Sequence, residues 1–399
     1  MPKKRLMTPG PTQVPEQALL MLAKQVNHHR TPEFVALFAE VLAGLKEVFQ
    51  TSGDVVVLTS SGTGAMEAAV VNLVPRGGKA IVLEAGVFAE RWTKICEAFG
   101  IEVVRHQIPW GEAVEPADVA RLLEQHPDAV AVFGTLMESS TGVGHDVKAI
   151  GQVVAPTGAL YVVDAISGAA VMECRTDEWG IDVLVVGSQK ALMLPPGLAF
   201  LSINDAARRQ MELVKPQAFY FDLKQHLKKI KDGPDTPWTP AHTMIAALAE
   251  NLKLIRAEGM EAVWARAKVL SQATRAGIEA IGLELFANRP ADGLTSVRMP
   301  EGVDGSAFLK RLESRFGIKV AGGQGQIKGK IFRIAHMGIL DELDILGTLS
   351  AIELVLVELG RHVELGAGVA AASRVLAAAQ SSRQPAAGSG QLAAGATRG

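Results

Sequence analysis

Three segments of the sequence carry groups that could act together in catalysis. Residues 61–64, Ser-Gly-Thr-Gly, follow an apolar run and open a helical pattern, so free backbone N–H groups and the positive end of a helix dipole would be available to a phosphate. Asp164 ends the apolar run 160–163, and Lys190 comes shortly after the apolar run 183–186. In an open α/β sheet, ligands bind at the carboxyl ends of the strands, where both side chains would emerge.

Each of these groups, taken alone, also has an ordinary structural explanation. Residues 61–64 could form a plain helix cap after a tight turn, Asp164 could cap a loop, and Lys190 could be a surface lysine at a strand end. Their conjunction at one predicted sheet edge favours pyridoxal phosphate. The phosphate of this cofactor binds a helix N-terminus, its aldehyde forms a Schiff base with a lysine, and its ring nitrogen is kept protonated by a carboxylate.

The spacing of Gly62 and Gly64 leaves a dinucleotide site as an alternative. The fingerprint is incomplete, because Glu67 stands where the third glycine is expected. The segment also lacks the Gly-Lys-Ser/Thr sequence of a P-loop. A nicotinamide-dependent oxidoreductase is therefore an alternative from a different class, and a non-catalytic protein of the same fold is a third.

The elements that must position these groups alternate along residues 54–205. Near-continuous apolar runs, separated by helical segments, are typical of strands buried on both faces. We expect strands at residues 55–58, 80–83, 102–104, 129–133, 160–163, 183–186 and 199–201. The predicted fold class is α/β, with a mostly parallel sheet flanked by helices.

Further elements are predicted on either side of this region. Apolar residues at three- and four-residue spacing predict a helix over residues 34–49, after the start signal Thr31-Pro32. Downstream we expect helices at 244–257, 260–281, 306–316 and 341–359, and short strands at 283–286, 295–299 and 330–335. The expected organisation is an N-terminal arm (1–15), a large cofactor-binding domain (16–255), a smaller α+β domain (256–365) and a disordered Ala/Gly/Ser-rich tail (366–399).

The composition excludes several classes of function. The chain has 399 residues and a formal net charge of -2, so neither nucleic acid nor an anionic membrane is an expected partner. No apolar stretch approaches the roughly 20 residues that cross a bilayer, and the N-terminus lacks the apolar region of a signal peptide, so we expect a soluble, cytoplasmic protein. Cys96 and Cys174 have no metal-ligand spacing, and His28-His29 has no partner carboxylate motif, so no metal site is expected.

The sequence resembles the class V aminotransferases among the fold-type I pyridoxal-phosphate enzymes, specifically the alanine–glyoxylate and serine–pyruvate branch. Six segments carry the resemblance, and they occur here in the order in which that family has them. The resemblance covers about residues 5–360. The segments are 8–12 (TPGPT), 61–68 (SGTGAMEA), 138–142 (ESSTG), 163–164 (VD), 187–192 (GSQKAL) with 195–197 (PPG), and 332–334 (FRI). Several segments in the right order are much more specific than any one of them.

The resemblance implies a role for each matching residue around the cofactor. Lys190 would be the Schiff-base lysine and Asp164 the partner of the ring nitrogen, and both would be catalytic. The remaining cofactor-binding residues would be Ser61, Gly62, Thr63 and Gln189 at the phosphate, Phe88 stacked on the ring, and Ser139 at its hydroxyl side.

The resemblance also implies a substrate site and a homodimer with shared active sites. Gly10 and Arg333 would bind the substrate, because the planar fork of an arginine matches a carboxylate bidentately. Thr243 would reach the phosphate of the neighbouring subunit, although residues 239–242 lack the tyrosine that related enzymes place there. Residues 321–326 contain no cysteine, which argues against the related cysteine desulfurases.

The predicted activity is transamination with pyridoxal 5'-phosphate as cofactor. The expected substrates are small amino acids and 2-oxo acids, with the amino group of alanine or serine moving to glyoxylate or pyruvate. We find no obvious second arginine for a distal carboxylate, which favours small donors. Arg30 and His29 keep an aspartate-type donor open, and an aminoethylphosphonate aminotransferase of the same family is a further alternative.

Overall fold

A seven-stranded sheet forms the centre of the large domain in the computed structural model, which describes residues 2–215 and 217–383. The strand order is β2-β10-β9-β8-β5-β3-β4, and all neighbours are parallel except β10, which is antiparallel to both β2 and β9. The strands are β2 (Asp54–Leu58), β3 (Lys79–Glu84), β4 (Glu102–Gln107), β5 (Ala129–Thr135), β8 (Leu160–Asp164), β9 (Val183–Gly187) and β10 (Ala199–Ile203). The expected α/β class and mostly parallel sheet are confirmed.

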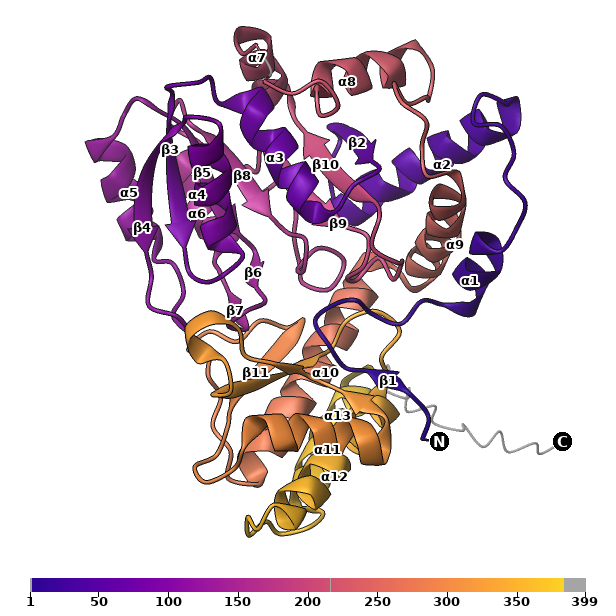
Figure 1. Ribbon diagram of the computed structural model, residues 1–399, viewed down its shortest axis with the longest axis vertical. Coiled ribbons are helices and arrows are strands. Elements are labelled where there is room, and N and C mark those ends of the chain that lie inside the picture. Colours follow the sequence, from indigo (N-terminus) through magenta and orange to yellow (C-terminus); the bar gives the residue numbers. More distant parts are fainter. Residues whose placement is uncertain (1, 216, 384–399) are drawn as a thin grey trace, which may run out of the picture.

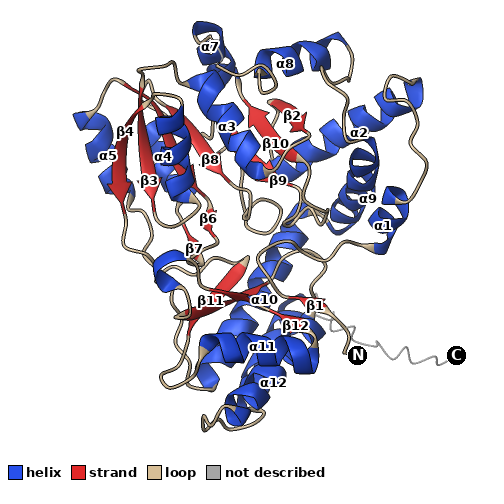
Figure 2. Ribbon diagram, viewed as in Figure 1, coloured by secondary structure: helices blue, strands red, loops and turns tan. Residues whose placement is uncertain are grey.

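Helices cover both faces of this sheet (Figures 1 and 2). One face carries α2 (Pro32–Phe49), α5 (Pro116–Gln125), α6 (Val147–Val154) and α9 (His242–Glu258), and α1 (Glu16–Leu22) packs against α9. The other face carries α3 (Gly62–Leu73), α4 (Ala89–Ala98), α7 (Asp205–Leu213) and α8 (Leu223–Asp232). As the sequence predicts, α2 starts at Thr31, whose hydroxyl accepts a hydrogen bond from Phe34 N at 3.4 Å.

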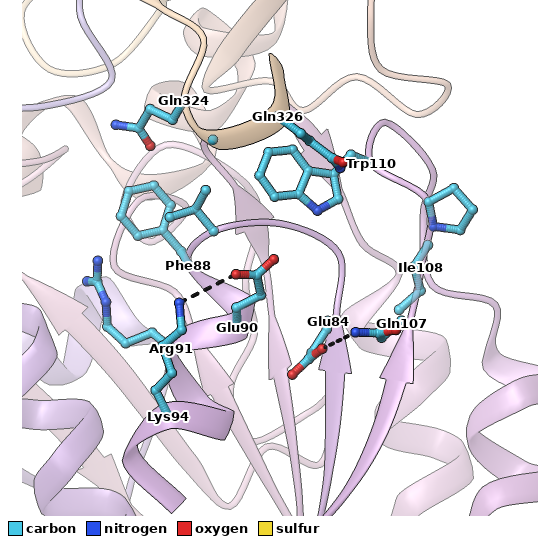
Figure 3. A pocket seen from close by; sticks show the side chains of 13 residues that line it. Glu84, Phe88, Glu90, Arg91, Lys94, Gln107, Ile108, Trp110, Gln324 and Gln326 are labelled. Carbon is cyan, nitrogen blue, oxygen red and sulfur yellow. Dashed lines mark hydrogen bonds and ion pairs between the residues drawn. The ribbon is translucent and has the colours of Figure 1, made fainter. Parts of the chain in front are cut away.

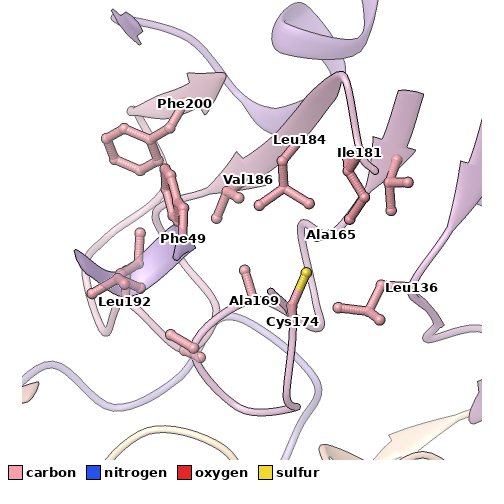
Figure 4. Packing of buried hydrophobic residues seen from close by; sticks show 14 of the residues in the cluster. Phe49, Leu136, Ala165, Ala169, Cys174, Ile181, Leu184, Val186, Leu192 and Phe200 are labelled. Carbon is pink, nitrogen blue, oxygen red and sulfur yellow. The ribbon is translucent and has the colours of Figure 1, made fainter. Parts of the chain in front are cut away.

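Successive residues of each strand point to opposite faces of the sheet, and a separate hydrophobic cluster lies on each face. In β9, Leu184 and Val186 belong to the cluster under α2, α5, α6 and α9, whereas Val183 and Val185 belong to the one under α3, α4 and α7. Figure 4 shows part of the first cluster. Strands covered on both sides need apolar residues at every position, which explains their continuous apolar runs.

The smaller domain has its own sheet and its own hydrophobic cluster. Its antiparallel sheet has the order β11-β14-β13, formed by Leu294–Arg298, Ile331–Ala335 and Ala321–Gly322. The helices are α10 (Met260–Ala280), α11 (Gly305–Phe316), α12 (Glu342–Glu358) and α13 (Ala367–Arg383). The strand expected at 283–286 is wrong, because this segment contributes only one isolated bridge, between Leu285 and Val297.

Two short pairs of strands complete the described chain. The N-terminal strand β1 (Arg5–Leu6) runs parallel to β12 (Ile318–Lys319) of the smaller domain. The strands β6 (Met137–Glu138) and β7 (Val143–Gly144) form a small hairpin after β5. No helix among the described residues is both long and apolar enough to cross a membrane.

The expectation of a disordered tail from residue 366 is wrong for the first part of that segment. Residues 367–383 form α13, which packs against α10. An added Cβ at Gly277 of α10 would lie 3.0 Å from Gly368 O, so the small residues allow the two helices a close approach. The Glu353 carboxylate accepts hydrogen bonds from Gly366 N at 2.7 Å and Gly368 N at 2.8 Å, which caps α13. Residues 384–399 lie outside the described residues.

Candidate active site

The sheet order brings the three predicted groups to one edge. β8 and β9 are parallel neighbours, and Asp164, the last residue of β8, pairs in register with Val185. Lys190 lies three residues beyond Gly187, which ends β9. Because β2 and β9 are both antiparallel to β10, they run in the same direction. The N-terminus of α3, which follows β2, therefore lies at the same edge as Asp164 and Lys190.

One cavity connects these groups. Eight of its lining residues are those to which the resemblance gives a cofactor role: Ser61, Gly62, Thr63, Phe88, Ser139, Asp164, Gln189 and Lys190. The other lining residues are Arg91, Met137, Ile166 and Ser167. We refer to this space as the cofactor cavity.

The first turn of α3 forms one end of the cofactor cavity. Ser61 is the N-cap residue but its side chain makes no capping hydrogen bond, and the turn contains no acidic residue. From α4, Arg91 donates a hydrogen bond to Thr63 Oγ1 at 2.9 Å, which brings a guanidinium group to the same turn. Backbone N–H groups, hydroxyls and a guanidinium together suit a phosphate.

Asp164, the last residue of β8, lines the same cavity and is only 4% exposed. Its Oδ1 accepts a hydrogen bond from Ile166 N at 2.8 Å. Burial raises the pKa of Asp164 to about 7, with the hydrogen bond from Ile166 N opposing the shift. A protonated ring nitrogen beside this group would favour the charged carboxylate, since a nearby opposite charge lowers the pKa of an acid.

The Lys190 amine is also largely withdrawn from water. Burial lowers its pKa to about 8, the Asp164 carboxylate raises it, and the Arg333 guanidinium lowers it further. Its Nζ donates a hydrogen bond to the backbone oxygen of Pro9 at 2.7 Å. A lysine with a lowered pKa has a larger neutral fraction near pH 7, which amine chemistry requires.

The Phe88 ring lies beside both cations of the cofactor cavity. Its centroid is 6.0 Å from Lys190 Nζ and 5.0 Å from the guanidinium carbon of Arg91. The turn that carries Phe88 is held by the fully buried Glu138, whose carboxylate accepts hydrogen bonds from Ala89 N at 2.9 Å and from Ser140 Oγ at 2.6 Å. Burial raises the pKa of Glu138, and these hydrogen bonds oppose the shift.

Arg333 reaches the site from β14 of the smaller domain. Its side chain is nearly fully buried, at 3% exposure of the residue, and burial lowers its pKa to about 10. It donates hydrogen bonds to Gly322 O from Nε at 3.0 Å and to Ser139 O from a terminal nitrogen at 2.5 Å. Ser139 lines the cofactor cavity, so these contacts place a guanidinium at its border.

The Gly10 backbone lies directly against the lysine. Gly10 has φ +120°, and an added Cβ would lie 2.6 Å from Lys190 Nζ. Any larger residue would therefore be strained in its backbone and would also displace the amine. The substrate-binding role that the resemblance implies for Gly10 stays a prediction.

Several residues of the site were not predicted from the sequence. Arg91 lies one helical turn after Phe88, a spacing that would place both on one face of a helix. Ser167 Oγ donates a hydrogen bond to Ser139 Oγ at 3.3 Å. Asn251 of α9 donates to the carbonyl oxygens of Leu192 and Met193, both at 2.9 Å, and so holds the turn that follows Lys190. No local signal marks Asn251, because it lies 61 residues after Lys190 in the sequence.

Two groups of predicted residues lie apart from the cofactor cavity. Thr243 is in the first turn of α9 and is not among the described residues that line the cavity. His28 and His29 stack on each other with ring centroids 4.6 Å apart, and Arg30 forms an ion pair with Asp235. Within residues 2–215 and 217–383, no group of three or more His, Cys, Asp or Glu side chains could hold a metal ion.

A larger cavity of about 930 Å³ adjoins the cofactor cavity (Figure 3). Phe88 and Arg91 line both cavities and thus form a common wall. The other walls come from the ends of β3 and β4, from α4, and from residues 324–326 of the smaller domain. Figure 3 shows Trp110 beside Gln326 at this domain boundary.

Comparison with known proteins agrees with this architecture. Residues 6–334 match the family model described as aminotransferase class-V. The small subunit of a soluble hydrogenase from Synechococcus sp. is 42% identical over 94% of this chain and 99% of that protein. An L-aspartate–glyoxylate aminotransferase of Paracoccus denitrificans is 34% identical over 92% and 94%. A serine–glyoxylate aminotransferase of Methylorubrum extorquens is 33% identical over 94% and 96%.

Solved structures give the same result. The ureidoglycine–glyoxylate aminotransferase of Bacillus subtilis has a TM-score of 0.89 and 30% sequence identity, covering 94% of this chain and 99% of that one. The fold and the site therefore define a transaminase of fold type I. The family model spans most of the chain, and the chain belongs to the class V aminotransferase family. The hydrogenase name is that of the Synechococcus relative and is not transferred to this chain.

Proposed function

We propose that this transaminase uses pyridoxal 5'-phosphate to move the amino group of alanine or serine to glyoxylate or pyruvate. The observation that carries the proposal is the cofactor cavity, which brings the Lys190 amine, the Asp164 carboxylate and the first turn of α3 together. These groups match the aldehyde, the ring nitrogen and the phosphate of the cofactor, respectively. The class V family is dependent on pyridoxal phosphate, which agrees with this match.

The charges and the open hydrogen-bonding groups of the cavity support the same cofactor. Four charged groups interact electrostatically with Lys190: the guanidinium groups of Arg91 and Arg333 and the buried carboxylates of Asp164 and Glu138. Three cations against two carboxylates suit an anionic cofactor and an anionic substrate. Gln189 also lines the cavity, and its side-chain amide nitrogen can donate a hydrogen bond to a phosphate.

The residues of the chain have distinct tasks in the proposed reaction. Bound pyridoxal phosphate would supply the carbonyl carbon that carries the amino group and a ring that accepts electrons. Asp164 would hold the proton on the ring nitrogen, and Arg333 would bind the substrate carboxylate and so orient Cα. Lys190 Nζ, as a neutral amine, would accept the proton of Cα and deliver it to the carbonyl carbon (C4′) of the cofactor, and the second half-reaction would run the same transfer in the opposite direction.

The small amino donors are favoured by the environment of Arg30. An aspartate-type donor would need a cation such as Arg30 for its second carboxylate. The Arg30 guanidinium instead forms an ion pair with the Asp235 carboxylate. Relatives named serine–glyoxylate and L-aspartate–glyoxylate aminotransferase support glyoxylate as the acceptor. The aspartate-type and aminoethylphosphonate donors are the alternatives that steady-state kinetics would decide.

We also propose that two copies of the chain form a dimer with shared active sites. Large apolar side chains are exposed on α1 and its neighbourhood, at Leu19, Leu20 and Val26, and at Phe219, which is 74% exposed. Burial of such side chains stabilises an interface. Thr243 would then contact the phosphate in the other subunit. Sedimentation equilibrium would test the dimer, and the cytoplasmic location stays a prediction.

The visible absorption spectrum of the purified protein tests the proposed function. After incubation with pyridoxal phosphate, we expect a yellow band that bleaches on addition of L-alanine or L-serine and returns with glyoxylate. Recovery of the band would show both halves of the reaction and identify the donor. A protein that stays colourless would overturn the proposal. So would a Lys190→Ala variant whose enzymatic activity equals that of the wild type, because a nicotinamide-dependent oxidoreductase does not need this lysine.

A further inference from the structure

Within the N-terminal arm (residues 1–15), the segment 5–12 is anchored to the smaller domain at its start. Strand β1 pairs with β12, and Met7 N donates a hydrogen bond to Lys319 O at 2.9 Å. The backbone oxygen of the same residue, Met7, accepts a hydrogen bond from Ala335 N at 2.9 Å. Ala335 lies two residues after Arg333 on β14, so the arm is tied to the strand that carries the proposed carboxylate-binding residue.

The other end of the arm is attached to the turn that carries Lys190. Thr12 N donates a hydrogen bond to Gln189 O at 3.1 Å, and Thr12 Oγ1 donates to Lys190 O at 2.8 Å. Between the two anchors, the Pro9 carbonyl oxygen accepts the hydrogen bond from Lys190 Nζ at 2.7 Å. The Gly10 backbone approaches the lysine so closely that a Cβ would not fit.

We propose that Thr12 is a positioning residue for Lys190, and that it fixes the arm so that the Pro9 carbonyl oxygen orients the lysine amine. Thr12 is only 5% exposed, and its hydroxyl bond joins the arm to the backbone of the reacting residue itself. The proposal rests on the proposed function, because it takes Lys190 to be the reacting amine.

The physical basis is the flexibility of a lysine side chain. Four rotatable bonds separate Nζ from the backbone, so a fixed Cα does not by itself fix the direction of the amine. A fixed acceptor at Pro9 restricts that direction, and small misplacements of a reacting group have large effects on rate. Asn251 holds the same turn from α9, and Thr12 N donates to Gln189 O whichever side chain stands at position 12, so loss of the Thr12 hydroxyl removes one of several supports.

The test compares Thr12→Val, which is isosteric but lacks the hydroxyl, with Thr12→Ser, which retains it. For Thr12→Val we expect kcat to fall about tenfold while KM for the amino donor changes less than about twofold, because orientation of the amine and not carboxylate binding is affected. Thr12→Ser should keep kcat within about twofold of wild type.

A matched control removes an equivalent hydrogen bond elsewhere. Thr176 is 2% exposed, and its Oγ1 donates a hydrogen bond to Phe49 O at 2.6 Å. It is not one of the described residues that line the cofactor cavity. Thr176→Val should therefore lower the melting temperature about as much as Thr12→Val, with kcat unchanged. Equal losses of kcat in Thr176→Val and Thr12→Val would overturn the proposal, because the effect would then follow general destabilisation.

A second readout needs no activity. In the cofactor-free protein, labelling of Lys190 by acetic anhydride is measured by peptide mass spectrometry at increasing pH. The charged groups that act on Lys190 are Asp164, Arg333, Arg91 and Glu138, and all stay in place in the variants. A loosened arm admits water to Nζ, so Thr12→Val should shift the labelling midpoint upward, toward ordinary lysine, whereas Thr12→Ser should not.

The two tests separate the inference from the proposed function. Wild-type protein without transaminase activity would contradict the proposed function, while the labelling midpoint would still decide the role of Thr12. An unchanged midpoint in Thr12→Val, or an equal shift in Thr12→Ser, would overturn the positioning role even in a fully active transaminase.

Discussion

At the scale of single residues, burial is the common cause of the unusual acidities in the site. It raises the pKa of Asp164 to about 7 and lowers the pKa of Lys190 to about 8. Both shifts favour the neutral form of the group in the absence of a ligand. A cofactor that carries a cationic ring nitrogen and an anionic phosphate would add further opposite charges to those that Asp164 and Lys190 already supply to each other.

Replacement of Asp164 by asparagine tests the partner of the ring nitrogen. The amide has nearly the same shape but no charge, so it would not hold a proton on the ring nitrogen. We expect kcat of Asp164→Asn to fall by about a hundredfold or more, a loss typical of a missing electrostatic contact in a buried site. Asp146→Asn, at the N-cap of α6, is the control and should leave kcat unchanged. Similar kcat values in the two variants would contradict the assigned role.

The lowered pKa of Lys190 predicts a pH-dependent cost in stability for the cofactor-free protein. Its folded-state pKa of about 8 lies below the ordinary value of 10.5, so the unfolded chain binds more protons between these values and stability rises with pH there. The charged lysine therefore costs stability below pH 8, by roughly 3 kcal/mol at about 1.4 kcal/mol per pKa unit.

Lys190→Met should accordingly raise the free energy of unfolding at pH 7 by roughly 3 kcal/mol. The gain should shrink as pH rises from 8 toward 10.5, as measured by urea unfolding at each pH. Lys148→Met removes a lysine whose side chain is 53% exposed and should show no such trend. A gain that is the same at every pH would contradict the lowered pKa.

At the scale of elements, α13 shows how composition alone can mislead. Its Ala- and Gly-rich sequence resembles a disordered tail, yet Ala372 is fully buried and Leu376 is 4% exposed. Small residues allow α13 and α10 to approach closely at Gly277 and Gly368, so many weak contacts replace a few large apolar ones. The high helix propensity of alanine and the four-residue spacing of Ala372 and Leu376 are the local signals that the composition argument overlooked.

Two glycine-to-alanine substitutions test this packing with opposite signs. In Gly277→Ala, the new Cβ would lie 2.5 Å from Leu349 Cδ1 and 3.0 Å from Gly368 O, so we expect a loss of about 1–3 kcal/mol in the free energy of unfolding. Gly347 of α12 has nothing within 4 Å of an added Cβ, so Gly347→Ala should gain about 0.5–1 kcal/mol from helix propensity. A stabilising Gly277→Ala would show that α13 does not pack there.

At the scale of the whole molecule, the site is assembled from two domains and the N-terminal arm. The large domain supplies Lys190 and Asp164, the smaller domain supplies Arg333, and the arm covers the lysine at Gly10. The hydrogen bond from Arg333 to Ser139 O crosses the domain boundary. In the proposed reaction, where Arg333 binds the substrate carboxylate, substrate binding would depend on how the two domains are held together.

Arg333→Lys tests this contribution of the smaller domain. A lysine cannot reproduce the planar, bidentate contact with a carboxylate, so KM for the amino donor should rise about tenfold or more, with a smaller change in kcat. Arg298→Lys, on the neighbouring strand β11 with a side chain that is 52% exposed, should leave both constants unchanged. An unchanged KM in Arg333→Lys would place the substrate carboxylate elsewhere.

The sequence by itself determined the features that depend on neighbouring residues. The seven strands of the large sheet, the N-terminus of α3 at Gly62, and the placement of Asp164 and Lys190 at strand ends follow from periodicity and from turn and cap residues, which act over a few positions. The family could also be identified from the sequence, because each matching segment is a short run of neighbouring residues and the segments occur in the order that the family has. The helix α2, with Thr31 as its cap, followed in the same way.

Only the tertiary structure decided which distant residues share the site. Asn251 at the lysine turn, Arg91 at Thr63 and the hydrogen bond from Thr12 to the Lys190 carbonyl all join segments far apart in the chain. Such contacts depend on strand order and helix packing, which short-range patterns do not encode. For the same reason, only the tertiary structure shows that α13 packs against α10.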